Sequence, residues 1–198
     1  MATKKKAKGI PTIDVCMVII KTTELEIAIE TAKKVAIEVQ TETTDAIKLV
    51  KNGKLIAQKG KKVTVTGNQI TMTDNVFIPE VAKILQGGKL EDTEGKGYPK
   101  YTPPEAGSGE EGEVFELVLY SAVYDASGQI VKYEQTTYPN CKGTPFGMTR
   151  EDDTFSSPEL VIDSAPKNGQ APYTIEYVDQ LPADYVETQR EVNGLSVI

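Results

Sequence analysis

The stretch Val35-Ala36-Ile37-Glu38-Val39-Gln40-Thr41-Glu42 decides the fold class, because apolar and polar residues alternate along it. Alternation with a period of two is typical of a β-strand that has one buried face and one solvated face. The apolar side chains of this strand are therefore expected to face the core. The polar side chains on the opposite face are Glu38, Gln40 and Glu42.

Further strands are predicted on both sides of turn signals. Residues 46–59 carry Asn52-Gly53 between apolar alternations, which predicts a hairpin with a type I′ turn. Residues 63–66 and 69–73 are rich in β-branched side chains, and Gly67-Asn68 between them predicts another turn. The remaining strands are expected over residues 114–124, 129–138, 154–162 and 173–178, with a loop over residues 139–147.

One segment has helical periodicity instead. Residues 79–86 place their apolar residues on one face, Asp74 or Asn75 can cap the start, and Gly87-Gly88 predicts the end. Eight or so strands with one helix predict a mainly β fold, an antiparallel β-sandwich or barrel with one flanking α-helix.

The chain is long enough for one domain, expected over residues 24–182. Residues 1–23 carry four lysines near their start and are expected to form a flexible arm, and residues 183–198 a flexible tail. Residues 89–112 hold five glycines and three prolines among acidic residues, which predicts a long loop without regular structure. Tyr98 and Tyr101 in this loop indicate a contact surface toward a neighbouring subunit.

The residues that common catalytic sites need are scarce. Histidine is absent, which removes Ser-His-Asp and Cys-His nucleophiles and imidazole metal ligands. Cys16 and Cys141 lie far apart and in no metal-ligand spacing, so idle thiols are expected. Glu151-Asp152-Asp153 is the densest acidic cluster, but it lacks the ligand spacing of a calcium loop and is expected to be a solvated turn. We therefore expect neither an enzyme nor a bound cofactor.

The charge and hydropathy exclude other classes. A formal net charge of -7 argues against a protein whose main task is to bind nucleic acid, since phosphate binding needs clustered lysine and arginine. No run of eighteen apolar residues occurs, so no membrane span is predicted. The first residues lack the apolar segment of a secretory signal, which favours synthesis and use in the cytoplasm.

Several patches suggest a family. They are TETTD at residues 41–45, GNQITMTDNVFIPE at residues 67–80 and LQGG at residues 85–88. The second half continues with YEQTTYP at residues 133–139, NCKG at residues 140–143 and DDTFSSPE at residues 152–159. In this order and spacing, across residues 24–182, the chain resembles the major tail tube proteins of tailed bacteriophages of Gram-positive bacteria.

The resemblance implies a β-sandwich or barrel with a flanking helix, assembled into hexameric rings that stack into a hollow tube. Such a subunit assembles in the host cytoplasm and resides in the virion tail. The implied partners are other copies of the chain and other tail proteins, such as the tape measure, terminator and baseplate or tip components. DNA then passes through the lumen without specific binding.

The resemblance also suggests a role for the polar face of residues 35–42. Glu38, Gln40 and Glu42 are expected to line the lumen, with the hairpin of residues 114–138 as an alternative or additional lining. A different class of function is the alternative, namely a non-enzymatic β-sandwich that binds a carbohydrate or a receptor on a virion or cell surface.

Overall fold

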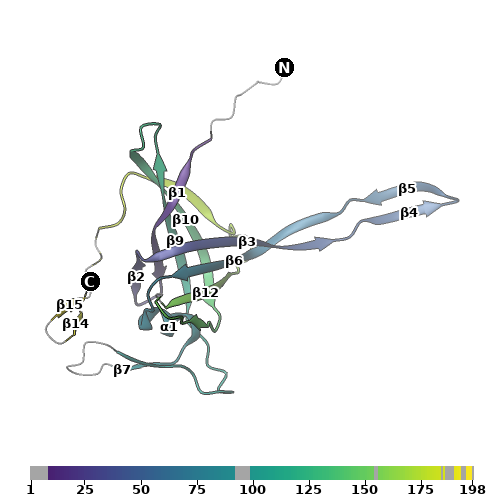
Figure 1. The fold of residues 1–198 in the computed structure, drawn as a ribbon. Helices are drawn as coiled ribbons and strands as arrows, with labels where there is room; N and C mark the ends of the chain where they lie inside the picture. Colours follow the sequence, from purple (N-terminus) through teal and green to yellow (C-terminus); the bar gives the residue numbers. More distant parts are fainter. Residues whose placement is uncertain are drawn as a thin grey trace.

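An antiparallel sheet of nine strands forms the body of the molecule, with the strand order β2-β1-β9-β10-β12-β6-β3 (Figure 1). Two further strands lie beside this path, because β13 pairs with β10 and β11 pairs with β12. The computed structural model describes residues 9–91, 99–153, 156–183 and 185, and the backbone of residues 190–192 and 195–197. The mainly β, antiparallel fold predicted from the alternating patterns is confirmed.

The strands of this sheet are β1 Thr12–Lys21, β2 Glu26–Ile29, β3 Ala32–Thr44, β6 Lys62–Asp74, β9 Val114–Tyr124, β10 Ile130–Gly143, β11 Met148–Thr149, β12 Ser157–Ser164 and β13 Thr174–Val178. Three separate hairpins are β4 Ile47–Lys51 with β5 Lys54–Lys59, β7 Lys89–Glu91 with β8 Lys100–Thr102, and β14 Arg190–Val192 with β15 Leu195–Val197. The helix is α1 Pro79–Gln86.

The long strand β10 belongs to two halves of the sheet. Residues 133–137 pair with β13, whereas residues 141–143 pair with β12. Between them Asn140 has a φ of 52°, and the register with β9 shifts at this point. A bulge of this kind bends its strand, so the sheet curls and β1 contacts β3. The loop expected over residues 139–147 is therefore wrong as far as Gly143.

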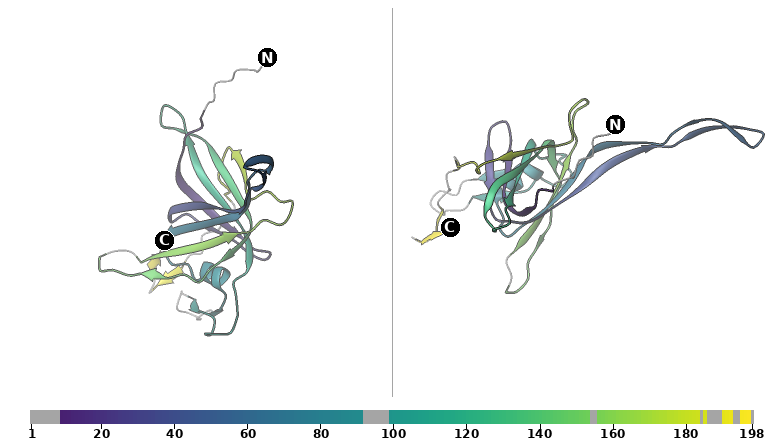
Figure 2. Two further views of the ribbon diagram at one scale, coloured as in Figure 1. Left: turned by 90° about the vertical axis from the view of Figure 1, so that its right-hand side faces the viewer. Right: turned by 90° about the horizontal axis from the view of Figure 1, so that it is seen from above.

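The main hydrophobic core lies inside this curl and is closed at one end by α1 (Figures 1 and 2). Strands from both halves of the sheet contribute to it, which explains why the curl holds its shape without a second sheet. Its most deeply buried members are Val18, Ile20, Ile29, Ile70, Met72, Leu85, Leu117, Cys141 and Ile162. A smaller cluster of Met17, Ile19, Val118 and Tyr120 packs with Val178, Leu181 and Tyr185.

Both ends of the chain contribute more to the body than expected. The flexible arm expected over residues 1–23 is wrong for residues 12–21, because β1 lies between β2 and β9. Ile19 and Ile20 are completely buried in different clusters, so both faces of β1 are covered. In the tail expected to be flexible over residues 183–198, the hydroxyl of Tyr185 donates to Glu26 Oε2 at 2.9 Å.

The turn predicted at Gly67-Asn68 is also wrong, because β6 runs straight through it. The register with β3 shifts between the pairs Gln40↔Gly67 and Thr41↔Val65, which marks a bulge. A Cβ added at Gly67 would collide with the backbone carbonyl oxygen of Ser164. The glycine is therefore explained by the close approach of β12, which is one of the reasons for a glycine inside a strand.

The helix and the loop after it combine a confirmed prediction with two corrections. The bounds of α1 agree with residues 79–86, and Gly87, with a φ of 81°, ends the helix. Ile78 holds the N-cap position without a side-chain cap, whereas Asp74 Oδ1 accepts the backbone N–H of Asn75 and Val76 just before it. The loop over residues 89–112 is not without structure, because β7 pairs with β8.

Candidate assembly surface

The strands β3 and β6 form a two-stranded ribbon that continues beyond the body. The strand β12 pairs with β6 only between Asn68 and Thr73, so in the described part of the chain β3 is the one strand that pairs with residues 62–67 of β6. We call residues 37–44 and 63–67 the ribbon. Its cross-strand pairs place alternate residues of both strands on the same face, so the ribbon has two chemically different faces.

One face of the ribbon is polar, as predicted. Glu38, Gln40 and Glu42 lie together on it and are all exposed. This polar face extends onto the body, because Glu38 is paired with Gln69, whose Nε2 donates to Asp163 Oδ1 at 3.1 Å. The three residues therefore belong to a polar surface that crosses β3, β6 and β12.

The opposite face of the ribbon is apolar, but the core does not cover it. Val35 packs against the main core, whereas Ile37 is 43% exposed and Val39 is 50% exposed. The bulge leaves Val63 and Val65 on this same face, and both are exposed as well. The expectation that this face of β3 is buried is therefore wrong beyond Val35, because the ribbon extends past the strands that would cover it.

The hairpin of β4 and β5 continues the ribbon outward as a thin arm (Figures 1 and 2). Asn52 and Gly53 at its tip both have positive φ, 50° and 74°, as a type I′ turn requires, so this turn prediction is confirmed. We call residues 45–62 the arm. Its exposed large apolar side chains are Ile47, Leu49, Val50, Leu55 and Ile56.

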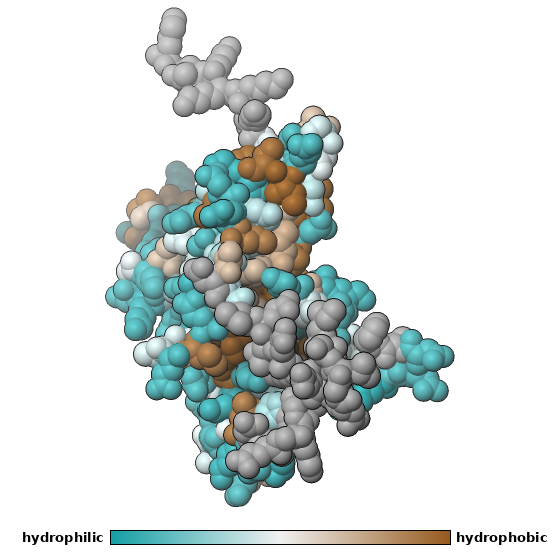
Figure 3. All heavy atoms as spheres, turned by 90° about the vertical axis from the view of Figure 1, so that its left-hand side faces the viewer, coloured by the Kyte–Doolittle hydropathy of each residue, from teal (hydrophilic) through white to brown (hydrophobic). Residues whose placement is uncertain are grey.

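The side of the body that faces away from the arm differs from the ribbon in how its apolar residues are distributed. On the side opposite the arm, hydrophobic atoms occur in separate patches surrounded by hydrophilic ones (Figure 3). Large exposed apolar residues outside the arm and ribbon include Ile130, Val131 and Val114. Exposed apolar residues that share one surface, as Ile37, Val39, Val63 and Val65 do on the ribbon, mark sites of contact with other macromolecules.

Tyr101, predicted to contact a neighbouring subunit, has an internal role. Its hydroxyl donates to the carbonyl oxygen of Gly87 at 2.9 Å and accepts from Gln86 Nε2 at 2.8 Å. Its ring lies 6.3 Å from that of Phe77, and burial raises the pKa of its phenol. Tyr101 thus fastens β8 to the end of α1, which the sequence did not indicate. Tyr98 lies outside the described residues.

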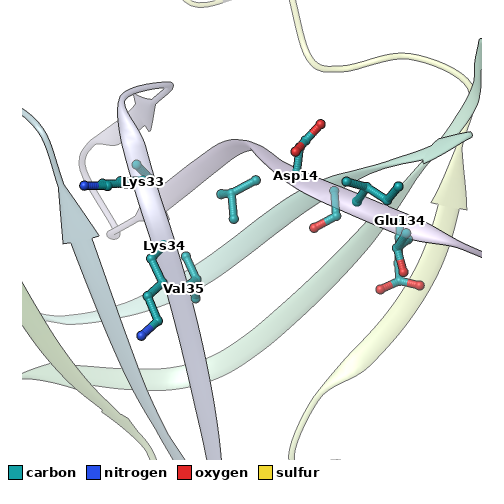
Figure 4. Close-up of a pocket in the computed structure, with 10 residues that line it drawn as sticks. Asp14, Lys33, Lys34, Val35 and Glu134 are labelled. Atoms are coloured by element: carbon teal, nitrogen blue, oxygen red, sulfur yellow. The ribbon is translucent and has the colours of Figure 1, made fainter. Parts of the chain in front are cut away.

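A groove of about 640 Å³ lies between the start of β1 and the start of β3. Asp14 and Glu134 line it together with Lys33 and Lys34, and Asp14 has a φ of 64° where β1 bulges against β9. The charged side chains point in different directions (Figure 4). They do not converge on a shared point, as the polar groups of a small-molecule site do.

The candidate reactive groups are placed as follows. Both thiols are free, and burial raises the pKa of Cys16 and raises that of Cys141 to about 12. Nucleophilic cysteines have lowered pKa values, so neither thiol is activated. Glu151, Asp152 and Asp153 are exposed, as expected of a solvated turn. Within the described part of the chain, no group of three or more Cys, Asp or Glu is placed to hold a metal ion.

Two further findings concern the chain as a whole. Among the described residues, no helix has the length and apolar character to cross a membrane. Comparison with known protein families found none that matches the chain, and comparison with curated proteins found no similar sequence.

Proposed function

We propose that this chain is a structural subunit that assembles with copies of itself into stacked hexameric rings, forming the tail tube of a bacteriophage. The observation that carries the proposal is the ribbon, which has an exposed apolar face and a polar face and is continued by an arm with five exposed large apolar side chains. The tail tube fold, the virion tail as location and the other tail proteins as partners belong to this proposal through the resemblance of the sequence.

Burial of the exposed apolar side chains favours association. Nine large apolar side chains are exposed on the arm and ribbon. Burying one such side chain fully stabilises a complex by about 1.5–3 kcal/mol, so these residues can contribute on the order of 10 kcal/mol when they are partly buried already. The cost of lost translational and rotational freedom is estimated at about 4–15 kcal/mol, which is of the same order. Burial of this surface therefore offsets a large part of the cost of assembly.

The strand edges favour the same conclusion. The strand order ends at β3, which is 13 residues long. Where β1 does not contact it, this edge strand presents unpaired backbone groups, and pairing with a neighbour's strand satisfies them. In the proposed ring, each ribbon lies against that of the next copy, and the face of Glu38, Gln40 and Glu42 points into the lumen.

Microscopy and light scattering of the purified chain test the proposal. Negative-stain images of concentrated protein are expected to show rings and tubes, and the scattering mass is expected to rise with concentration. A variant without residues 46–59 keeps the body and serves as the matched control, expected to remain a monomer. A parent chain that stays monomeric at every concentration, and that binds a carbohydrate or receptor fragment instead, would contradict the proposal and support a binding module.

A further inference from the structure

Charge is unevenly distributed between the arm and the rest of the molecule. Residues 45–62 hold six lysines and one aspartate, a formal charge of +5, whereas the whole chain carries -7. The rest of the chain therefore carries -12. The lysines of the arm are Lys48, Lys51, Lys54, Lys59, Lys61 and Lys62, and all are exposed. A partner that suits the arm has apolar side chains surrounded by acidic ones.

Residues 105–114 of the same chain offer such a surface. Four glutamates occur here without any lysine or arginine in the segment, and all four are exposed. Glu111 is already paired with Lys142 of β10, so Glu105, Glu110 and Glu113 are the carboxylates that the segment offers to the arm. Ala106 and Val114 lie exposed among them. Two contacts hold this segment against the end of α1: the N–H of Glu113 donates to the carbonyl oxygen of Ile84 at 2.8 Å, and the N–H of Gly88 donates to Glu110 Oε1 at 3.0 Å.

The arm of one molecule does not reach this segment of the same molecule. In Figure 1 the arm leaves the body toward the right, while α1 and the chain that follows it lie at the bottom. The two strands of the arm are paired between Ile47 and Lys59, and Figures 1 and 2 show the arm extending away from the body. Any contact between the arm and residues 105–114 therefore joins two copies of the chain.

We propose that the arm docks on residues 105–114 of a second copy, with its apolar side chains against Val114 and its lysines beside the glutamates. This inference rests on the proposed self-assembly and names the two surfaces that meet. Apolar burial supplies most of the affinity, since exposed ion pairs contribute little individually. The opposite charges select the partner and orient it. Because the two surfaces differ, the contact is heterologous and generates rings or filaments.

A charge exchange tests the pairing. Lys51→Glu with Lys54→Glu reverses the charge at the tip of the arm, and Glu105→Lys with Glu113→Lys changes the formal charge of the acceptor from -4 to 0. Each pair is expected to raise the critical concentration for assembly at least about tenfold, because the attraction between opposite charges is weakened or lost. The four substitutions together restore the net charge of -7 and are expected to restore assembly. Lys33→Glu with Lys167→Glu changes the net charge as much as the arm pair does and is expected to leave assembly unchanged.

Cross-linking separates this inference from the proposed function. A photoreactive amino acid at position 56 is expected to cross-link to residues 103–114 of another copy, as mapped by mass spectrometry. Cross-links to that segment in oligomers that are not tubes would support the docking and contradict the tube. Tubes whose arm cross-links elsewhere, or whose combined variant does not recover although it folds, would contradict the docking. Loss of binding to a 30-base-pair duplex DNA in the arm variant, with assembly unchanged, would assign the arm to nucleic acid.

Discussion

Two pairs of residues that contain glycine and asparagine have different backbone conformations, although their local sequences are similar. Asn52-Gly53 and Gly67-Asn68 both lie between β-branched or apolar runs, and both predict turns. In the structure the first pair has positive φ at both residues and turns, whereas the second lies within β6. Gly67 is required by its neighbour β12, since a Cβ at this position would meet the backbone of Ser164, which is distant in sequence. Local sequence therefore cannot distinguish the two pairs.

Substitution of Gly67 tests this explanation. Gly67→Ala is expected to lower the free energy of unfolding by about 1–3 kcal/mol, since the new Cβ overlaps the carbonyl of Ser164 and the strands must separate. Gly60→Ala is the matched control, because a Cβ there meets no atom within 4 Å, and a change within about 0.5 kcal/mol is expected. Urea denaturation of both variants supplies the comparison. Equal effects at the two positions would show that the close approach of β12 does not explain Gly67.

Two buried side chains make the stability of the body sensitive to alkaline pH. Burial raises the pKa of Cys141 from 9.0 to about 12 and that of Tyr138 from 10.0 to about 12. Both groups are neutral when protonated, so a raised pKa in the folded state means that the unfolded state loses its protons first. Their contribution to stability is complete below about pH 9 and is lost as the pH rises toward 12.

The melting temperature is therefore expected to fall between pH 9 and pH 12. Tyr138→Phe removes one of the two ionisable groups and is expected to flatten this dependence while leaving the value at pH 7 little changed. Tyr173→Phe is a control, since its ring lies 6.0 Å from that of Tyr138 but the side chain is exposed. Scanning calorimetry in a pH series makes the measurement, and identical slopes for the parent and Tyr138→Phe would assign the alkaline loss to other groups.

At the scale of elements, the sequence predicts the strands and the helix that have a periodic pattern. It does not predict a strand that lacks one. The strand pattern of β3, the hairpin of β4 and β5, and the bounds of α1 follow from local alternation, turn chemistry and a glycine stop. The strand β1 was missed because it is buried on both faces, so its apolar run has no alternation. The polar face of the ribbon, with Glu38, Gln40 and Glu42, was predicted from the same local alternation. The exposed apolar half was not, since alternation shows that a face is apolar and only tertiary structure shows whether it is covered.

The arm is expected to behave as an element separate from the core. Gly53→Val places a β-branched residue at a φ of 74°, where such a side chain is strained, and is expected to disturb the register of β4 and β5. The melting temperature of the body is expected to stay within about 2 °C of the parent, because the arm contributes no residue to either core cluster. Hydrogen exchange of the arm amides and the yield of tubes are both expected to change.

Asn52→Gly is the control for the arm, because glycine adopts positive φ without strain. It is expected to retain slow exchange in the arm and a normal yield of tubes. Faster exchange in Gly53→Val with an unchanged yield of tubes would show that an ordered arm is not needed for assembly.

At the scale of the whole molecule, the two faces of the ribbon suit two different environments in an assembly. The apolar face of Ile37 and Val39 is suited to burial between subunits, and the polar face of Glu38, Gln40 and Glu42 is suited to remain in water. In a tube, only the lumen and the outer surface remain in water. Placing the acidic face at the lumen gives the bore the same sign of charge as DNA, which prevents the passing genome from adhering to it.

Reversing one charge on this face tests where it points. Duplex DNA carries about one negative charge per 1.7 Å, and neutralising roughly six to ten phosphates makes binding strong and steeply dependent on salt. With the sixfold symmetry that the resemblance implies, Glu38→Lys adds about six cations to each ring, which reaches the lower end of that range. Genome ejection from virions with Glu38→Lys is expected to slow at low salt and to recover as salt is raised.

The control is Glu176→Lys, which reverses an exposed charge on β13. Virions with this substitution are expected to eject DNA at the parental rate. Ejection of DNA by intact Glu38→Lys tails at the parental rate at low salt would place Glu38 outside the lumen, and the hairpin of β9 and β10 would then be the next candidate for its lining.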